Sequence, residues 1–186
     1  MERLSVQDAP CGFIKLVYLQ PQTDVRGSLT RVFCRDELSS LGWNKPVAQI
    51  NQSFTQQRGT VRGMHCQTKP HSEMKLVTCI RGAVFDVVID VRENSPTFLK
   101  WQAEELSDKD NKALFIPEGV AHGFQTLSDN VELLYIHSTP YEATAEFGIH
   151  PLDPLVAINW PNKVINMSSR DSGHKLLDVH FRGLEA

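Results

Sequence analysis

Hydrophobic and polar side chains alternate along much of this chain, and this period of two constrains the fold more than any other feature. In the segment 85–91 (FDVVIDV), every second side chain from Phe85 onward is apolar, whereas Asp86 and Asp90 share the opposite face with Val88. Successive side chains of a β-strand point to opposite faces, so this segment predicts a strand between a hydrophobic core and a polar cavity.

Turn-forming residues separate many further segments of this kind. Strands are predicted at residues 12–19, 29–33, 48–54, 59–65, 75–81, 97–105, 112–116, 119–127 and 131–139. The intervening turns carry Gly, Pro, Asn or Asp. Only one or two short helices are expected, at residues 36–42 and near Asp171. Many short strands at close spacing predict an all-β fold, a sandwich or barrel of the jelly-roll kind.

Length and charge restrict the classes of function. The 186 residues, 41% of them hydrophobic, suffice for one domain with a full core, so residues 1–186 are expected to form a single domain. A net charge of −3 without any basic block argues against a nucleic-acid partner. No segment resembles a signal peptide or a membrane span, and the four widely spaced cysteines suit reduced thiols. We therefore expect a cytoplasmic protein with no membrane partner.

Two histidines have a sequence context that suits a site. His65 closes a predicted strand and shares a face with Gly63, whose small size would leave room for a ligand beside the imidazole. Arg62 would point the other way unless a bulge at Gly63 returned it to the same face. His122 also has small neighbours, which could admit a ligand or serve tight packing. Both histidines can be read as catalytic or as core residues.

The remaining candidates are weaker on their residues alone. Lys75 is more typical of a solvated lysine, and Tyr135 of a packed aromatic residue. The other five histidines are assigned no role: His71, His137, His150, His174 and His180. Metal-dependent jelly rolls commonly place two histidines two residues apart, but Gln67 occupies that position after His65, so no metal and no cofactor are predicted.

Ordered segments spread over most of the chain carry a resemblance to one family. They are Asp24 to Gly27, Gln49 to Ser53, Val61 to Gln67, Lys75 to Val77, Gly82 to Val87 with Asp90 and Arg92, Ser95 to Phe98, Ile116 to Phe124, Tyr135, Tyr141, Asp153-Pro154, Trp160-Pro161 and Ser168 to Asp171. In these segments the chain resembles the dTDP-4-dehydrorhamnose 3,5-epimerase family. The resemblance implies a cupin-type jelly roll, a nucleotide-diphosphate sugar as substrate, and a homodimer.

The resemblance also implies roles for individual residues. His65 matches the general base, Asp171 the carboxylate that orients it, Tyr135 the general acid and Lys75 the cation beside the C4 carbonyl oxygen. It further implies that substrate is bound by Arg26, Gln49, Asn51, Arg62, Asp86, His122, Tyr141 and Arg170, with Arg26 and Arg170 facing the diphosphate. The expected reaction inverts C3, C5 or both in a 4-keto-6-deoxyhexose.

Departures from the family pattern leave alternatives open. Arg31 replaces an acidic residue, Leu29 and Cys66 replace aromatic residues, Met64 a Leu, Glu73 a Gln and Leu99 a Gly. The substrate could therefore be GDP- or CDP-linked, or only one carbon could be inverted. A metal-dependent cupin enzyme and a non-catalytic module that binds sugar nucleotides are the rivals from other classes.

Overall fold

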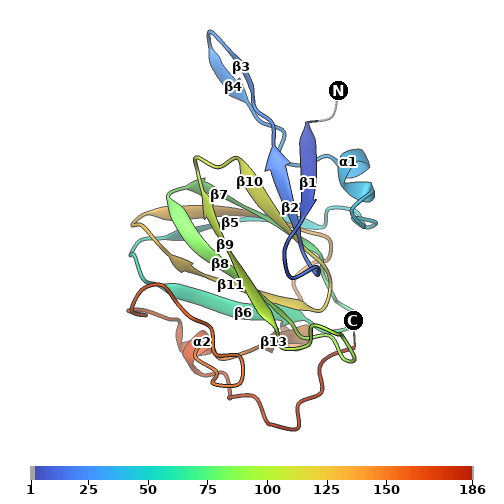
Figure 1. Ribbon diagram of the computed structural model, residues 1–186, viewed down its shortest axis with the longest axis vertical. Helices are drawn as coiled ribbons and strands as arrows, with labels where there is room; N and C mark the ends of the chain where they lie inside the picture. Colours follow the sequence, from blue (N-terminus) through green and yellow to red (C-terminus); the bar gives the residue numbers. More distant parts are fainter. Residues whose placement is uncertain (1–2, 186) are drawn as a thin grey trace.

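Two antiparallel β-sheets make up most of the computed structural model, which describes residues 3–185 (Figure 1). The first sheet has six strands in the order β1 (Leu4–Asp8), β2 (Lys15–Leu19), β10 (Lys112–Ile116), β7 (Lys75–Arg81), β12 (Val131–His137) and β5 (Gln49–Thr55). The second has five, in the order β13 (Glu146–Gly148), β6 (Val61–Gln67), β11 (Val120–Thr126), β8 (Ala83–Asp90) and β9 (Trp101–Ser107). The predicted all-β sandwich is confirmed.

The main hydrophobic core lies between the two sheets. Val77 and Leu133 from the first sheet pack there with Val84, Val88 and Phe124 from the second. The alternation predicted for residues 85–91 is confirmed, but both faces of β8 are covered. The opposite face of β8 packs beneath the C-terminal segment, with Phe85, Val87, Ile89, Ile149 and Val156 in one cluster. Asp86 lies on the inner face beside Val84 and Val88.

Local polar interactions changed the extent of some strands. Residues 97–105 were predicted as one strand, but β9 begins only at Trp101. The hydroxyl groups of Ser95 and Thr97 donate hydrogen bonds to Asp90, and Leu99 has a φ of 57°. These contacts fold the first part of the segment into a turn.

The segment 29–33 was also predicted as a strand, and this was wrong beyond Leu29. Val32 and Phe33 instead pack against a satellite core that contains Leu38 and Trp43. Three-dimensional packing therefore overrides the β-propensity of these residues. The two predicted helices are present as α1 (Arg35–Ser39) and α2 (Ser169–Ser172), and a 3₁₀ turn, η1, covers Ala143–Ala145.

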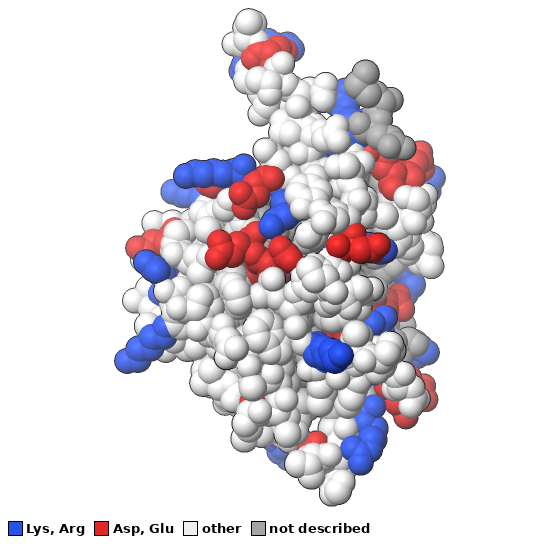
Figure 2. Space-filling view, in the orientation of Figure 1, with Lys and Arg blue, Asp and Glu red and all other residues white. Residues whose placement is uncertain are grey.

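A short hairpin projects from the body of the molecule (Figures 1 and 2). It consists of β3 (Gln22–Asp24) and β4 (Gly27–Leu29), and among the strands of the described residues these two pair only with each other. Val25 at its tip is fully exposed, and Leu29 is 67% exposed. Such apolar exposure at the end of a projecting element is typical of a surface that contacts another molecule. Within residues 3–185, no helix has the length and apolar character needed to cross a membrane.

Candidate active site

One pocket of about 560 Å³ opens between the two sheets and is closed on one side by the C-terminal segment. It gathers side chains from β5, β6, β7, β11, β12 and α2. The predicted site residues that line it are Gln49, Asn51, Arg62, His65, Lys75, His122, Tyr135, Tyr141, Arg170 and Asp171. Asp86 lies behind His122, and Arg26 lies on the projecting hairpin, outside the pocket of its own chain.

A register shift between β6 and β11 brings Arg62 and His65 to the same pocket. His122 pairs with His65 and Phe124 with Arg62, so three residue steps on β6 match two on β11. This is the additional residue of a β-bulge, which re-aims the side chains on either side of it. Arg62 would otherwise point away from the pocket.

Two glycines make this close pairing possible, and they correct one expectation. A Cβ on Gly63 would lie 2.4 Å from the Cα of Gly123, and a Cβ on Gly123 would lie 2.5 Å from the sulfur of Met64. The space beside Gly63 is therefore filled by the backbone of the neighbouring strand and is not available to a ligand.

His65 and Asp171 form a hydrogen-bonded pair at the pocket wall. Nε2 of His65 lies 2.8 Å from Oδ1 of Asp171, whose Oδ2 accepts a hydrogen bond from the backbone N–H of Gly63. Ser168 caps α2 by accepting from the N–H of Asp171, which fixes the carboxylate in place. We assign the Nε2–H tautomer from this bond, which leaves Nδ1 as the basic nitrogen.

The surroundings keep the Asp171 carboxylate ionised. Burial raises its pKa, but the hydrogen bond and charge of His65 and the N–H of Gly63 outweigh burial and lower the pKa to about 2. An ionised partner stabilises the imidazolium that forms when His65 accepts a proton.

Tyr135 comes from the opposite sheet and faces the same pocket. Its hydroxyl group lies 3.1 Å from that of Ser53, and its ring stands 6.2 Å from the ring of His122. Burial raises the pKa of Tyr135 above its ordinary value, more than the bond with Ser53 lowers it. The phenol therefore stays protonated at neutral pH and can donate a proton.

His122 is paired with Asp86 in a second, deeper dyad. Nε2 of His122 lies 2.9 Å from both carboxylate oxygens of Asp86, which is fully buried. Burial raises the pKa of Asp86, while His122 acts in the opposite direction. The small residues beside His122 could have admitted a ligand or allowed tight packing. Gly123 allows tight packing, because it lies against the backbone of β6.

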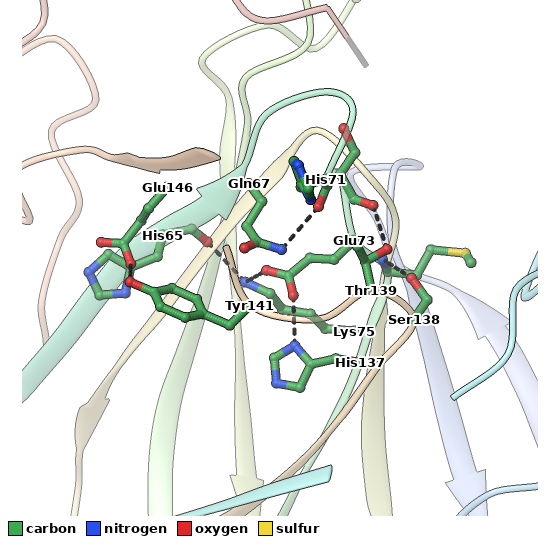
Figure 3. Close-up of polar contacts among 12 residues, drawn as sticks. His65, Gln67, His71, Glu73, Lys75, His137, Ser138, Thr139, Tyr141 and Glu146 are labelled. Carbon is green, nitrogen blue, oxygen red and sulfur yellow. Dashed lines mark hydrogen bonds and ion pairs between the residues drawn. The ribbon is translucent and has the colours of Figure 1, made fainter. Parts of the chain in front are cut away.

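Lys75 is neither solvated nor free. Its ammonium group lies 3.0 Å from Glu73 and donates to the backbone carbonyl of His65 at 3.1 Å (Figure 3). Nδ1 of His137 lies 2.7 Å from the other oxygen of Glu73. His137, to which the sequence assigned no role, thus belongs to the pocket wall.

The mouth of the pocket carries a second polar group of residues. Glu146 accepts hydrogen bonds from the hydroxyl of Tyr141 at 2.9 Å and from Arg170 at 3.1 Å. Another guanidinium nitrogen of Arg170 lies 3.5 Å from Nδ1 of His65. Glu146 comes from β13, a strand of three residues that is too short to show the alternation of a β-strand in its sequence.

One group of side chains has the composition of a metal site. Potential ligand atoms of His65, Glu146 and His174 lie within 4.8 Å of one another. However, the guanidinium group of Arg170 already contacts both Glu146 and His65 there. A metal ion would have to displace this cation, so the arrangement favours acid/base chemistry over metal binding.

Fold and site together define a class: an isomerase built on a cupin-type jelly roll, with an imidazole, a phenol and an ammonium group around one pocket. The comparisons narrow this class to one family. The model of the dTDP-4-dehydrorhamnose 3,5-epimerase family matches residues 13–178, and the chain belongs to that family.

Individual relatives agree with this assignment. The chain is 37% identical to a dTDP-4-dehydrorhamnose 3,5-epimerase of Sinorhizobium fredii, over 95% of this chain and 91% of the relative. It is 40% identical to a dTDP-4-dehydrorhamnose 3-epimerase of Streptomyces niveus, over 85% and 76%. The solved structure of the dTDP-6-deoxy-D-glucose-3,5-epimerase of Legionella pneumophila, in complex with dTDP-4-keto-L-rhamnose, superposes with a TM-score of 0.90 at 32% identity, covering 98% of this chain and 99% of that one.

Proposed function

We propose that this protein epimerises a dTDP-linked 4-keto-6-deoxyhexose at C3 and C5, converting dTDP-4-dehydro-6-deoxyglucose to dTDP-4-dehydrorhamnose. The observation that carries the proposal is that a His65–Asp171 dyad and the Tyr135 phenol come from opposite sheets to one pocket that also holds the Lys75 ammonium group. The names of the relatives in Sinorhizobium and Legionella support the choice of substrate.

The proposed mechanism begins with removal of a proton next to the ketone. Nδ1 of His65 accepts this proton. The C–H electron pair forms a double bond to C4, and the π electrons of the carbonyl group move to the C4 oxygen, which gives an enolate. Lys75 stabilises that charge through a positioned N–H. Tyr135 then donates its proton to the same carbon from the opposite face, which inverts the centre. Proton return from His65 would instead restore the original configuration.

A second candidate function is inversion at one carbon only. The relative in Streptomyces niveus is named a 3-epimerase, and a 3′-monoepimerase of Streptomyces bikiniensis superposes with a TM-score of 0.81 at 31% identity. Cys66, where the family usually has an aromatic residue, borders the pocket but is buried against Met64 and Ile149, so the names of these two relatives are the main support for this candidate.

Solvent-deuterium incorporation followed by NMR tests both candidates. The purified protein is incubated in deuterated water with dTDP-4-keto-6-deoxyglucose and with its GDP- and CDP-linked counterparts. We expect deuterium at C3 and C5 of the dTDP sugar, or at C3 alone if only one carbon is inverted. His65→Asn should abolish exchange while nucleotide affinity stays within about threefold. Binding without exchange by the parent protein would contradict the proposal and favour a binding module.

We also propose that the protein works as a homodimer in the cytoplasm. Apolar side chains are exposed on the first sheet, including Ile50, Phe54 and Ile80, and a second copy would cover them. Arg26 can reach a diphosphate only if the hairpin β3–β4 extends to the pocket of that copy. The four cysteines are unpaired, as suits a reducing compartment.

A further inference from the structure

The polar network around Lys75 carries an inference that rests on the proposed function and extends it. Glu73, Lys75 and His137 all line the pocket, and each side chain is at most 12% exposed. A buried carboxylate is costly unless it is paired. Burial raises the pKa of Glu73, but Lys75 and His137 outweigh it and lower the pKa below its usual range. Glu73 therefore stays ionised between two partners.

The two carboxylate oxygens of Glu73 contact different partners. One oxygen lies 3.0 Å from Nζ of Lys75, and the other lies 2.7 Å from Nδ1 of His137. The ring of His137 stacks on that of Tyr135 at a centroid distance of 6.1 Å, and its Nε2 lies 3.4 Å from the side-chain amide of Asn51. His137 thus anchors Glu73 to the strand that carries Tyr135.

The ammonium group of Lys75 is held from two sides. Lysine has three N–H donors, and two of them have partners within residues 3–185: Glu73 and the backbone carbonyl of His65. A lysine side chain is otherwise flexible, so these two contacts determine where the third donor points. Because Lys75 lines the pocket, the third donor is the one left for a ligand there.

We propose that Glu73, anchored by His137, is a positioning residue that directs the third N–H of Lys75 at the ketone oxygen of the substrate. The contact with the His65 carbonyl ties the cation to the strand of the base, and the contact with Glu73 ties it to the strand of the acid. The developing enolate therefore meets a donor that is already in place, and no side-chain reorganisation is required during proton transfer.

The test compares substitutions at Glu73 with and without Lys75, using initial rates of deuterium incorporation into dTDP-4-keto-6-deoxyglucose. Glu73→Ala should lower kcat by about 10- to 100-fold with little change in KM, because the donor loses its direction but not the substrate contacts. Glu73→Gln should recover to within about threefold of the parent, since an amide can accept from Lys75 and contact His137. His137→Phe, which keeps the ring against Tyr135, should fall between these two.

A double-mutant cycle separates positioning from general damage. If Glu73 acts through Lys75, Glu73→Ala should cost nothing further in a Lys75→Met background. Thr139→Val is the matched control, because Thr139 donates to the carbonyl of Ser72 beside Glu73 but does not line the pocket. It should keep the parental rate.

Several outcomes would overturn the inference. These are additive losses in the cycle, a Gln variant as slow as the Ala variant, or an Ala variant with the parental rate. Because each is measured against exchange by the parent protein, these outcomes differ from a failure of the proposed function, in which the parent itself would not exchange.

Discussion

At the scale of single residues, the site depends on ionisable groups that burial alone would neutralise. Asp171 is 2% exposed and would be protonated more readily than a free carboxylate if it had no partners. His65 and the N–H of Gly63 reverse that tendency. Asp171 therefore links the proposed catalytic dyad to the stability of the fold, since its carboxylate resists protonation more strongly in the folded protein than in an unfolded chain.

This linkage predicts how stability changes with pH. The pKa of Asp171 is about 2 in the folded protein and about 3.9 in an unfolded chain. A lowered pKa contributes stability above the unfolded value, and that contribution disappears as pH falls from about 4 to about 2. It should amount to roughly 2 kcal/mol.

Urea denaturation at a series of pH values measures this contribution as the difference between the parent and Asp171→Asn. The difference should be constant above about pH 5 and shrink as pH falls from about 4 to about 2. Ser168→Ala, which removes the helix cap but keeps the carboxylate, is the control. A difference between parent and Asp171→Asn that does not vary with pH would contradict the assignment.

Tyr135 makes a different prediction, because it is proposed to act only after the enolate has formed. Tyr135→Phe removes the proton donor but leaves His65 and Lys75 in place. Deuterium exchange should persist while net inversion slows by about 100-fold or more, as for loss of a general acid. Ser53→Ala removes only the hydrogen-bond partner of Tyr135 and should change the ratio of the two rates much less. Equal losses of exchange and inversion in Tyr135→Phe would argue against the acid role.

At the scale of strands, the sequence predicted best the strands whose boundaries are determined by their own residues. β7 and β10 were predicted with the observed bounds, because each is an apolar run ended by turn residues. β13 was missed because it has three residues and depends on pairing with β6. The shared orientation of Arg62 and His65 could only be suggested, since a bulge depends on the register of the partner strand.

The glycine pair between β6 and β11 gives the prediction at this scale. Gly123→Ala would place a methyl group 2.5 Å from the sulfur of Met64 and 2.7 Å from the carbonyl oxygen of Arg62. The strands would have to separate at the bulge, at a cost of about 2–4 kcal/mol in the free energy of unfolding, and with loss of exchange because Arg62 and His65 shift.

Gly12→Ala is the matched control for this substitution. Gly12 has a positive φ of 75°, but an added Cβ would meet no atom of the described residues within 4 Å, so only backbone strain of about 1–2 kcal/mol is expected, with exchange unchanged. Thermal unfolding and deuterium-exchange rates, measured for both variants and the parent, test these expectations. A Gly123→Ala protein with parental stability would show that the strands tolerate separation.

At the scale of the whole molecule, the proposed catalytic groups come from opposite sheets. His65 lies on β6 in the second sheet, whereas Lys75 and Tyr135 lie on β7 and β12 in the first. No local pattern brings such distant residues together, so residues alone left Lys75 and Tyr135 without a role and only the family resemblance grouped them. Glu73, His137 and Glu146 were missed because the contacts that bring them to the pocket join residues far apart in the sequence, Glu73 with His137 and Glu146 with Arg170.

The hairpin that carries Arg26 supplies the prediction for the assembled protein. The side chain of Arg26 is 86% exposed, and its one hydrogen-bonding partner within residues 3–185 is Asp24 of the same turn. Its proposed contact with a diphosphate therefore requires the pocket of a second copy. Arg26→Ala and His65→Asn should each be nearly inactive at low substrate concentration, the first through a raised KM and the second through loss of the base. Unfolding and refolding an equal mixture of the two variants should restore activity.

In a mixed dimer, the intact His65 of one copy meets the intact Arg26 of the other. If Arg26 instead served its own chain, every site would lack one group and the mixture would stay inactive. Light scattering on the same samples reports whether they are dimers, and a monomeric parent protein with full activity would exclude the exchange of hairpins between copies.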